Sequence, residues 1–211
     1  MDKNSAFSPA LIRRLPAYFR TLIRFYGTGK SRVSSEELAH EIRLTPSQVR
    51  ADLKVLGCQG QRSYGYGIPS LYKRIADILQ LSDKFSAVIV GSTPLSYSIA
   101  DTPIFSKRGI KLTAHFDDDG VVSVDKEDVL PFAELEGFLQ SDGADILITA
   151  GSEESAKAAL SYAEGAEKDI EVWNFTDLEL FSESITVKNV HLSDYLMMLC
   201  LMAHRDGEYK N

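Results

Sequence analysis

The stretch SSEELAHEIRLTPSQVRADLKVLGCQGQRSYGYG, residues 34–67, decides the fold of the N-terminal part of the chain. Ser34 and Glu37 have the spacing of a capping box, in which each side chain bonds the other residue's free amide, and they open one helix. Thr45 and Gln48 repeat this spacing, with a proline in the first turn, and open a second helix. Two short helices joined by a tight turn predict a helix-turn-helix.

The second of these helices has one apolar and one polar face. Val49, Leu53 and Leu56 recur three or four residues apart, so we expect them to face the core. The opposite face then carries Ser47, Gln48, Arg50, Ala51 and Lys54. Gln and Arg can form paired hydrogen bonds with adenine and guanine edges, and Lys and Arg bind phosphates. This face predicts DNA recognition; the alternative is an ordinary solvated helix surface.

A glycine-rich segment follows, in which Gly57, Gly60, Gly65 and Gly67 alternate with polar and aromatic residues. Such a segment is unsuited to a helix and favours a tight hairpin. Placed after a recognition helix, the hairpin predicts a wing that brings Arg62 and Tyr64 to the DNA backbone or minor groove. Helical periodicity also predicts a helix from Pro9 to Tyr26 and another from Pro69, the latter joining two domains.

Charge is divided unevenly along the chain. The whole sequence has a net charge of −7, yet residues 1–80 carry 13 Lys and Arg against 6 Asp and Glu. Residues 81–211 carry 10 against 24. This asymmetry favours an N-terminal domain attracted to phosphates and an acidic C-terminal domain held off DNA.

Several classes of protein are disfavoured by composition. No apolar run approaches the roughly 20 residues that span a bilayer, and residues 1–10 lack the layout of a signal peptide, so we expect a cytoplasmic protein. Cys58 and Cys200 are too far apart for a disulfide framework or a zinc site, and we expect both to be buried. The four histidines show no ligand spacing, and no catalytic constellation or metal site is predicted.

The C-terminal two-thirds alternates strand-like and helical segments. Strands are predicted over residues 87–91, 111–117, 144–151, 170–175 and 186–190, with a helix over 153–164. The alternation predicts an α/β, Rossmann-like domain with a parallel sheet. We therefore expect three parts: residues 1–80, a winged helix-turn-helix; 81–192, the Rossmann-like domain; and 193–211, an apolar helix capped by Ser193 that packs on a partner chain.

The first strand of this domain leads into a partial dinucleotide-binding motif. The motif requires Gly-x-Gly-x-x-Gly, because glycines let the backbone approach a pyrophosphate. Here the stretch is Gly91-Ser92-Thr93-Pro94-Leu95-Ser96, which keeps only the first glycine. Asp117 ends the second strand, where an acid could bind a ribose or simply cap a turn.

Taken together, the sequence resembles the Rex family of redox-sensing transcriptional repressors. The resemblance is carried by Arg14-Leu15-Pro16-x-Tyr18-Phe19-Arg20, Arg32-Val33-Ser34-Ser35-x-x-Leu38, Gln48-Val49-Arg50-x-Asp52-Leu53 and Gly57-x-x-Gly60-x-x-x-Tyr64-Gly65-Tyr66. It continues in Phe116-Asp117, Asn174-Phe175 and Val187-x-Asn189-Val190.

The resemblance implies a homodimer that exchanges its C-terminal helix, binds a palindromic operator in double-stranded DNA, and releases it when NADH binds. The expected DNA contacts are Arg32, Ser34, Ser47, Gln48, Arg50, Lys54, Arg62 and Tyr64. The expected NAD(H) contacts are Gly91, Ser92, Thr93, Leu95, Asp117 and Thr149.

The sensing residues depart from the family's pattern. Thr102 stands where members carry a tyrosine, and His191 and Leu192 where they carry Asp and Phe; Arg20, which would pair with that Asp, is retained. We therefore expect a divergent repressor with a weakened or lost response to NAD(H). The alternatives are an NAD-dependent oxidoreductase and a ligand-independent DNA-binding dimer.

Overall fold

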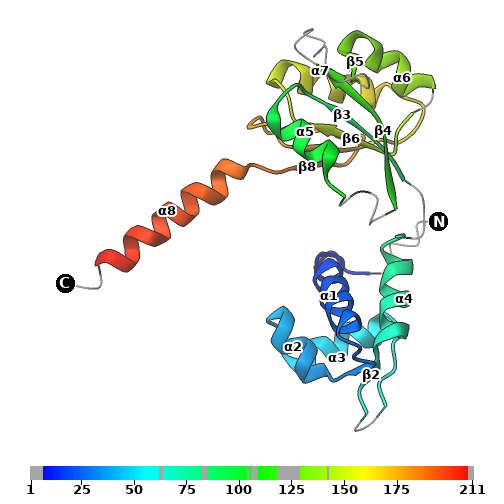
Figure 1. The fold of residues 1–211 in the computed structure, drawn as a ribbon, viewed down its shortest axis with the longest axis vertical. Coiled ribbons are helices and arrows are strands. Elements are labelled where there is room, and N and C mark those ends of the chain that lie inside the picture. Colours follow the sequence, from blue (N-terminus) through cyan, green and yellow to red (C-terminus); the bar gives the residue numbers. More distant parts are fainter. Residues whose placement is uncertain are drawn as a thin grey trace. The chain divides into compact units, whose positions relative to one another are not determined.

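A computed structural model describes residues 7–61, 64–81, 85–103, 105, 109–117, 129–141 and 143–208, and the side chains of these up to Ala203. The chain divides into two compact units, Met1–Asp83 and Lys84–Asn211 (Figure 1). Each unit has its own hydrophobic core.

The N-terminal unit consists of four helices and a two-stranded sheet. The helices are α1 (Pro9–Gly27), α2 (Ser35–Ile42), α3 (Pro46–Val55) and α4 (Ile68–Ile78); the strands are β1 (Arg32–Val33) and β2 (Tyr66–Gly67). Val49, Leu53 and Leu56 are fully buried in the core that α1, α2 and α4 complete, which confirms the predicted inward face of α3.

The capping predictions for α2 and α3 are confirmed with one exception. Ser34 accepts from the Glu37 amide, and the Glu37 side chain accepts from the Ser34 amide. Thr45 accepts from the amide of Gln48, but the predicted reciprocal bond is wrong, because the Gln48 side chain donates instead to Asp52. The hydrogen bond from the Gln48 amide N–H to the Asp52 carboxylate is charge-assisted. It is therefore stronger than the neutral bond that the Gln48 amide oxygen would accept from the backbone at the cap.

The glycine-rich segment turns back on itself as predicted, since an isolated antiparallel bridge joins Gln61 to Gly65. Its last strand, β2, pairs antiparallel with β1, which precedes α2 in the chain. β1 was not predicted, since two residues carry no periodicity and the strand forms only by pairing with β2. Arg62, a predicted DNA contact, lies outside the described residues.

The C-terminal unit is built on a six-stranded parallel sheet. Its strands are β3 (Phe85–Val90), β4 (Ile110–Asp117), β5 (Val129–Pro131), β6 (Ile146–Thr149), β7 (Glu171–Asn174) and β8 (Val187–Asn189), in the order β5-β4-β3-β6-β7-β8. This is the order of a doubly wound Rossmann sheet, as predicted. The short edge strand β5 was missed, because it contains Pro131 and pairs only with β4.

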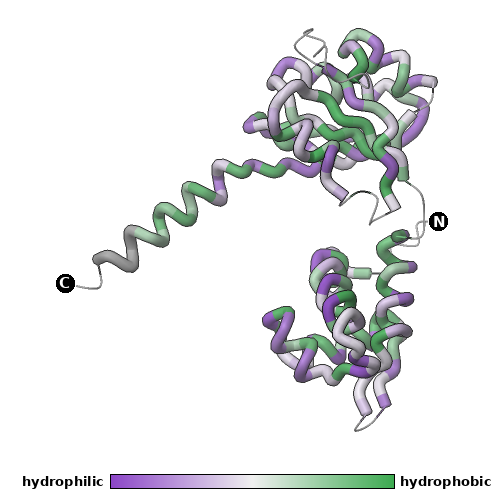
Figure 2. The backbone as a smooth tube through the Cα atoms, in the orientation of Figure 1, coloured by the Kyte–Doolittle hydropathy of each residue, from purple (hydrophilic) through white to green (hydrophobic). Residues whose placement is uncertain are grey.

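Helices cover both faces of this sheet. α5 (Pro94–Asp101) contributes to the core around Ala87 and Ile89 on one face. α6 (Leu135–Ser141), which follows the 3-10 turn η3 (Phe132–Glu134), packs with α7 (Glu153–Glu164) over Val88 and Val90 on the other. Figure 2 shows the apolar strands between these layers. Alternate residues of β3 thus supply two cores, as a doubly covered strand requires.

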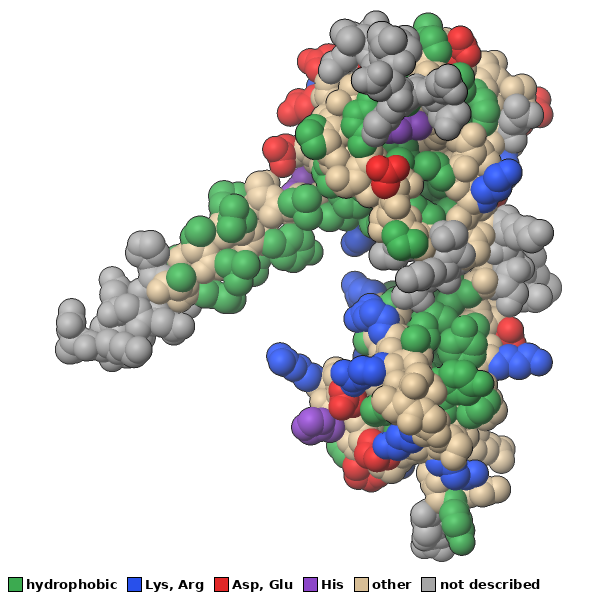
Figure 3. All heavy atoms as spheres, in the orientation of Figure 1, with side chains coloured by type: hydrophobic (Ala, Val, Ile, Leu, Met, Phe, Trp, Pro, Cys, Tyr) green, Lys and Arg blue, Asp and Glu red, His purple; other side chains and the backbone are tan. Residues whose placement is uncertain are grey.

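The last helix, α8, spans Leu192–Glu208. Eight of its large apolar side chains are each more than half exposed, from Leu192 at 55% to Tyr195 at 66%, and Figure 3 shows green side chains along its visible face. Ser193 is not its cap, because the helix starts one residue earlier and the Ser193 hydroxyl donates to Asp177. The expected burial of Cys200 is also wrong, since it lies exposed on this helix.

Candidate nucleic-acid interface

The exposed face of α3 carries the residues that the sequence assigned to it. Ser47, Gln48, Arg50, Ala51 and Lys54 are all exposed. Arg50 and Lys54 are one helical turn apart on this face and supply two positive charges. Figure 3 shows several Lys and Arg side chains (blue) scattered among other side chains on the visible surface of the N-terminal unit. The face therefore offers both base-reading and phosphate-binding groups.

Arg50 is held toward the start of α2. Its Nη1 lies 3.2 Å from the Ser35 hydroxyl and 3.3 Å from Glu36 Oε1. The Arg50 and Glu36 side chains are both more than half exposed, so the ion pair is screened by solvent and holds Arg50 only weakly. Arg50 can leave this pair when a phosphate or base edge approaches.

Asp52 forms a buried hydrogen-bond network behind this face. Arg14 of α1 donates to both oxygens of the Asp52 carboxylate, at 2.8 and 2.7 Å. The Tyr18 hydroxyl donates at 3.0 Å and Gln48 Nε2 at 2.7 Å. Burial opposes ionisation, but the bonds from Arg14, Gln48 and Tyr18 outweigh it and lower the pKa of Asp52. The network fixes α3 to α1.

Arg32 braces the wing from β1. Its Nε donates to the Tyr64 carbonyl at 2.7 Å, and its Nη2 donates to Gln61 Oε1 at 3.1 Å and the Gly65 carbonyl at 3.2 Å. Tyr64 itself is 71% exposed. Arg32 therefore supports the backbone that presents Tyr64, while remaining exposed to an approaching phosphate.

A groove of about 920 Å³ joins the wing to the two helices. Among the predicted DNA contacts, Arg32, Ser34, Arg50 and Tyr64 line it. Ser34 is engaged as the N-cap of α2, so that helix begins at the groove. The structure thus brings four sequence-predicted residues into one surface feature and places Ser47, Gln48 and Lys54 beside it on α3.

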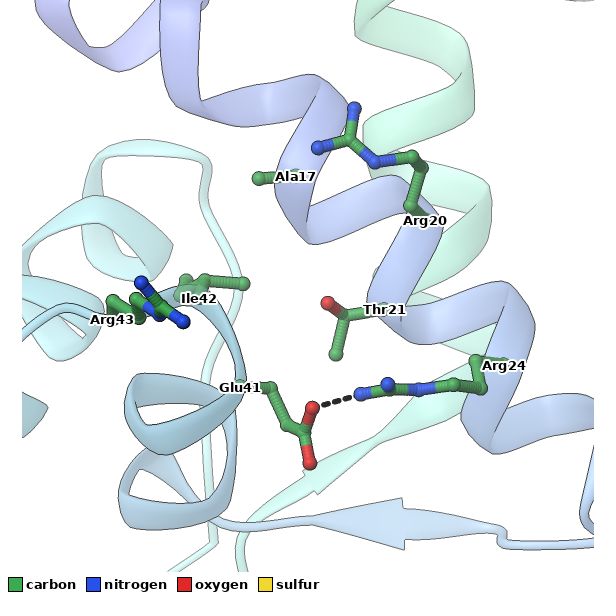
Figure 4. Close-up of a pocket in the computed structure, with 7 residues that line it drawn as sticks. All are labelled: Ala17, Arg20, Thr21, Arg24, Glu41, Ile42 and Arg43. Atoms are coloured by element: carbon green, nitrogen blue, oxygen red, sulfur yellow. Dashed lines mark hydrogen bonds and ion pairs between the residues drawn. The ribbon is translucent and has the colours of Figure 1, made fainter. Parts of the chain in front are cut away.

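A second group of arginines lines a pocket of about 380 Å³ between α1 and the end of α2 (Figure 4). Arg20 and Arg24 come from α1, which also contributes Ala17 to the lining, and Arg43 comes from the turn after α2. Arg24 forms an ion pair with Glu41 of α2. Arg43 adopts a left-handed backbone conformation, which ends α2 and directs the chain into the turn.

In the C-terminal unit, the strand order reverses between β3 and β6, and ligands of such sheets bind at the carboxyl ends of these strands. Gly91 directly follows β3 with a φ of +140°. A Cβ there would lie 2.6 Å from the carbonyl carbon and oxygen of Ala150 and the nitrogen of Gly151. Glycine is required because the loops after β3 and β6 touch.

Thr93 and Ser96 occupy the positions of the motif's second and third glycines. The Thr93 hydroxyl donates to the Ala150 carbonyl at 2.6 Å and accepts from the Ser96 amide, which caps α5. Ser96 is fully buried, and its hydroxyl lies 2.8 Å from the Gly91 carbonyl. Side chains therefore cross-link the loop that glycines would leave open.

The other predicted NAD(H) contacts lie around the same edge of the sheet. Asp117 ends β4, is 1% exposed, and accepts a hydrogen bond from the Ser92 hydroxyl. Thr149 is fully buried, and its hydroxyl donates to Asn174 at 2.8 Å. Leu95 is half-buried in the first turn of α5. The structure brings these residues together at one edge, with several polar groups already engaged.

His191 pairs within its own unit. Its Nε2 lies 2.6 Å from Glu179 Oε2 and its Nδ1 lies 3.2 Å from the Thr176 carbonyl. The hydrogen bond that His191 donates to the Glu179 carboxylate raises the pKa of His191. Thr102 ends α5 as its C-cap. His191 and Thr102, two of the residues that depart from the family's pattern, therefore have local structural partners.

Sequence reasoning missed the roles of Asp52 and Arg14, which it quoted only as parts of a motif. The spacing of Gln48 and Asp52, four residues apart on a helix, was an available signal for their contact. The contact of Arg14 with Asp52 had no local signal, because 38 residues separate them.

Comparison with known proteins identifies relatives of the whole chain. A family model described as "Putative DNA-binding protein N-terminus" matches residues 7–54. The "Redox-sensing transcriptional repressor Rex" of Clostridium botulinum (strain Alaska E43 / Type E3) is 37% identical, over 97% of this chain and 99% of that protein. The protein of the same name from the Hall strain is 34% identical, over 96% and 98%.

Two solved structures are also similar to nearly the whole chain. The crystal structure of RSP in complex with beta-NAD+ and operator DNA has a TM-score of 0.85 at 31% identity, over 97% of this chain and 95% of that chain. The crystal structure of RSP in complex with beta-NADH has a TM-score of 0.81 at 29% identity, over 97% of each chain. Within the described residues, no helix has both the length and the apolar character to cross a membrane.

Proposed function

This chain belongs to the Rex family of redox-sensing transcriptional repressors, and from that premise we propose that it represses transcription by binding operator DNA through α3 and the wing. The observation that supports this proposal is the exposed polar and basic face of α3, which lies beside the groove between the wing, α2 and α3. Named relatives are repressors, so the oxidoreductase alternative gains no support from them. A repressor must reach bacterial DNA, so we propose the cytoplasm as its compartment.

In this proposal, Ser47, Gln48, Arg50 and Lys54 contact DNA from α3, in the major groove. Arg32, Tyr64 and Arg62 contact the DNA backbone or the minor groove from the wing, and Ser34 positions the start of α2 against the DNA. The uneven charge along the chain supports this, because the basic residues are concentrated before residue 81.

We propose a homodimer that binds an inverted repeat, with α8 packing on the partner chain. The exposed apolar side chains of α8 support this, because a contiguous exposed apolar surface of this kind marks an interaction site. The parts we propose are a DNA-binding domain over 1–80, a sheet domain over 81–192 and a dimerisation helix over 193–211.

Replacing Arg50 or Lys54 with alanine tests the DNA contact directly. Each substitution is expected to weaken binding and to reduce the slope of log K against log salt by about one, because one fewer counterion is released. Fluorescence anisotropy with a selected inverted repeat, at several salt concentrations, measures both. Lys73→Ala, an exposed charge on α4, is the matched control and should leave the slope unchanged. Unchanged slopes in both α3 variants would refute this assignment.

Glu36→Gln is expected to increase the affinity for DNA by about twofold to fivefold, a small effect because exposed ion pairs are weak. The substitution frees Arg50 from Glu36 and removes a negative charge from the groove. Glu36→Gln combined with Arg50→Ala is the control. If the glutamate acts through Arg50, its effect should shrink in the Arg50→Ala background; an equal increase there would assign it to general charge repulsion.

We propose that the response to NAD(H) is weakened or lost, leaving a ligand-independent DNA-binding dimer as the limiting case. Thr93 places a branched side chain where a pyrophosphate would approach, and Pro94 has no amide to donate. The cross-links from Thr93 and Ser96 hold the loop in this arrangement. Gly91, Ser92, Thr93, Leu95, Asp117 and Thr149 are the residues that would contact NAD(H) if it binds.

Calorimetry with NADH, NAD⁺ and ADP tests this second proposal. We expect no saturable heat from any of the three nucleotides at millimolar concentration, and no effect of NADH on the operator complex. Heat from the same preparation with DNA is the positive control. Saturable NADH binding that releases the operator would contradict the proposal and restore a redox sensor.

A further inference from the structure

The hydrogen bond between Gln48 and Asp52 determines which way the Gln48 amide turns. Asp52 is 3% exposed and ionised, and an ionised carboxylate can only accept hydrogen bonds. Gln48 must therefore direct Nε2 toward Asp52 Oδ1. The opposite orientation would place the amide oxygen against a carboxylate oxygen, two acceptors in contact.

This orientation leaves a defined pair of groups facing outward from α3. One N–H of Gln48 is used by Asp52, so one N–H and the carbonyl oxygen Oε1 remain. The side chain is exposed, and among the described residues no donor contacts Oε1. Gln48 therefore presents one donor beside one acceptor, although a free glutamine would have two donors.

Only one purine edge matches that pair. Adenine offers N7 as an acceptor and N6–H as a donor in the major groove, whereas guanine offers two acceptors, N7 and O6. The single free N–H can satisfy one guanine acceptor, and Oε1 would then face the other. We propose that Gln48 contacts adenine in each half of the operator and that Asp52 is the positioning residue that excludes guanine.

Arg14 and Tyr18 keep Asp52 in this role. Arg14 binds both carboxylate oxygens and supplies the opposite charge, while the Tyr18 hydroxyl contacts Oδ2 and not the oxygen that Gln48 uses. A neutral amide in place of the carboxylate could both donate and accept, so it would permit either orientation of Gln48. The negative charge of Asp52 therefore fixes the orientation of the Gln48 amide, and that orientation selects adenine over guanine.

The test uses the full-length protein and the duplex that it selects from a random pool. Each adenine of that duplex is replaced in turn by 7-deaza-adenine, which lacks the N7 acceptor, and separately by guanine. For the wild-type protein, one adenine in each half-site should show a loss of at least about fivefold on either replacement. Gln48→Ala should show no loss at that position.

Asp52→Asn should bind the unmodified duplex but reduce the preference for adenine over guanine at that position. Tyr18→Phe is the matched control: it removes one bond to the same carboxylate, leaves Gln48 in place, and should keep the full preference. Gln48→Glu provides a second variant that leaves Asp52 intact, and it should also lose the preference. Thermal unfolding shows which variants are folded.

The inference depends on the proposed function, and the outcomes separate the two. If the wild-type protein selects no sequence, both are overturned. Two other outcomes overturn only the inference. In the first, the protein selects a sequence, but replacing any adenine weakens binding equally in the wild type and in Gln48→Ala. In the second, Asp52→Asn and Gln48→Glu both keep the wild-type preference for adenine over guanine.

Discussion

Arg14→Ala is expected to destabilise the N-terminal unit by about 3 kcal/mol, at the lower end of the cost of breaking a buried ion pair from one side. The Asp52 side chain, 4% exposed in the wild-type protein, would lose its cation and keep only the bonds from Tyr18 and Gln48. Urea denaturation followed by circular dichroism measures the loss. Trp173, the single tryptophan, lies in β7, so its fluorescence reports separately on the sheet unit, which should be unaffected.

The effect should depend on pH in a defined direction. The pKa of Asp52 is lowered in the folded protein, so its contribution is present above the unfolded value of about 3.9 and is lost as pH falls through the folded value. Arg14→Ala removes the strongest of the bonds that lower this pKa, so the pKa of Asp52 should be higher in the variant than in the wild type. The difference between the two proteins should therefore be largest near neutral pH and shrink in acid. Arg13→Ala, an exposed neighbour, should show neither effect; equal losses in both variants would exclude a specific role for Arg14.

Gly65→Ala is expected to disrupt the wing. Gly65 has a φ of +68°, and an added Cβ would lie 2.4 Å from the Val33 carbonyl oxygen. The left-handed conformation costs an L-residue about 1–2 kcal/mol, and relief of the clash requires β1 and β2 to separate. DNA affinity should fall by about 1–3 kcal/mol, the loss of one specific contact or more, because Tyr64 and Arg32 depend on this backbone.

Gly27→Ala is the matched control for this substitution. Gly27 ends α1, and nothing lies within 4 Å of the position its Cβ would take. The free energy of unfolding and the DNA affinity of the Gly27→Ala protein should stay close to those of the wild type. If Gly65→Ala retains full affinity in the same anisotropy assay, the wing makes no energetic contribution to DNA binding.

The parts of the fold that sequence predicted are those set by neighbouring residues. α7 spans Glu153–Glu164 as predicted, and Thr45 caps α3, because periodicity and caps are local features. β1, β2 and β5 have two or three residues each and exist by pairing with distant segments, so local patterns locate them poorly. The start of α8 was misplaced because the serine favoured as a cap bonds Asp177 instead.

The candidate site shows the same division. The outward face of α3 followed from the spacing of Val49, Leu53 and Leu56. Glu36 engages Arg50 across 14 residues, and the wing engages Arg32 across 29 to 33 residues. No periodicity encodes contacts over such separations. The degenerate loop was visible in sequence, but its cross-links from Thr93 and Ser96 appear only where β3 and β6 lie side by side.

Hydrogen exchange of the full-length protein, with and without its selected duplex, tests the central claim most directly. DNA bound by α3 and the wing should slow amide exchange in peptides covering residues 45–67, while peptides from β3 and β6 change little. Protection confined to the sheet unit, in a complex that demonstrably forms, would contradict the assignment of α3 as the DNA-reading helix.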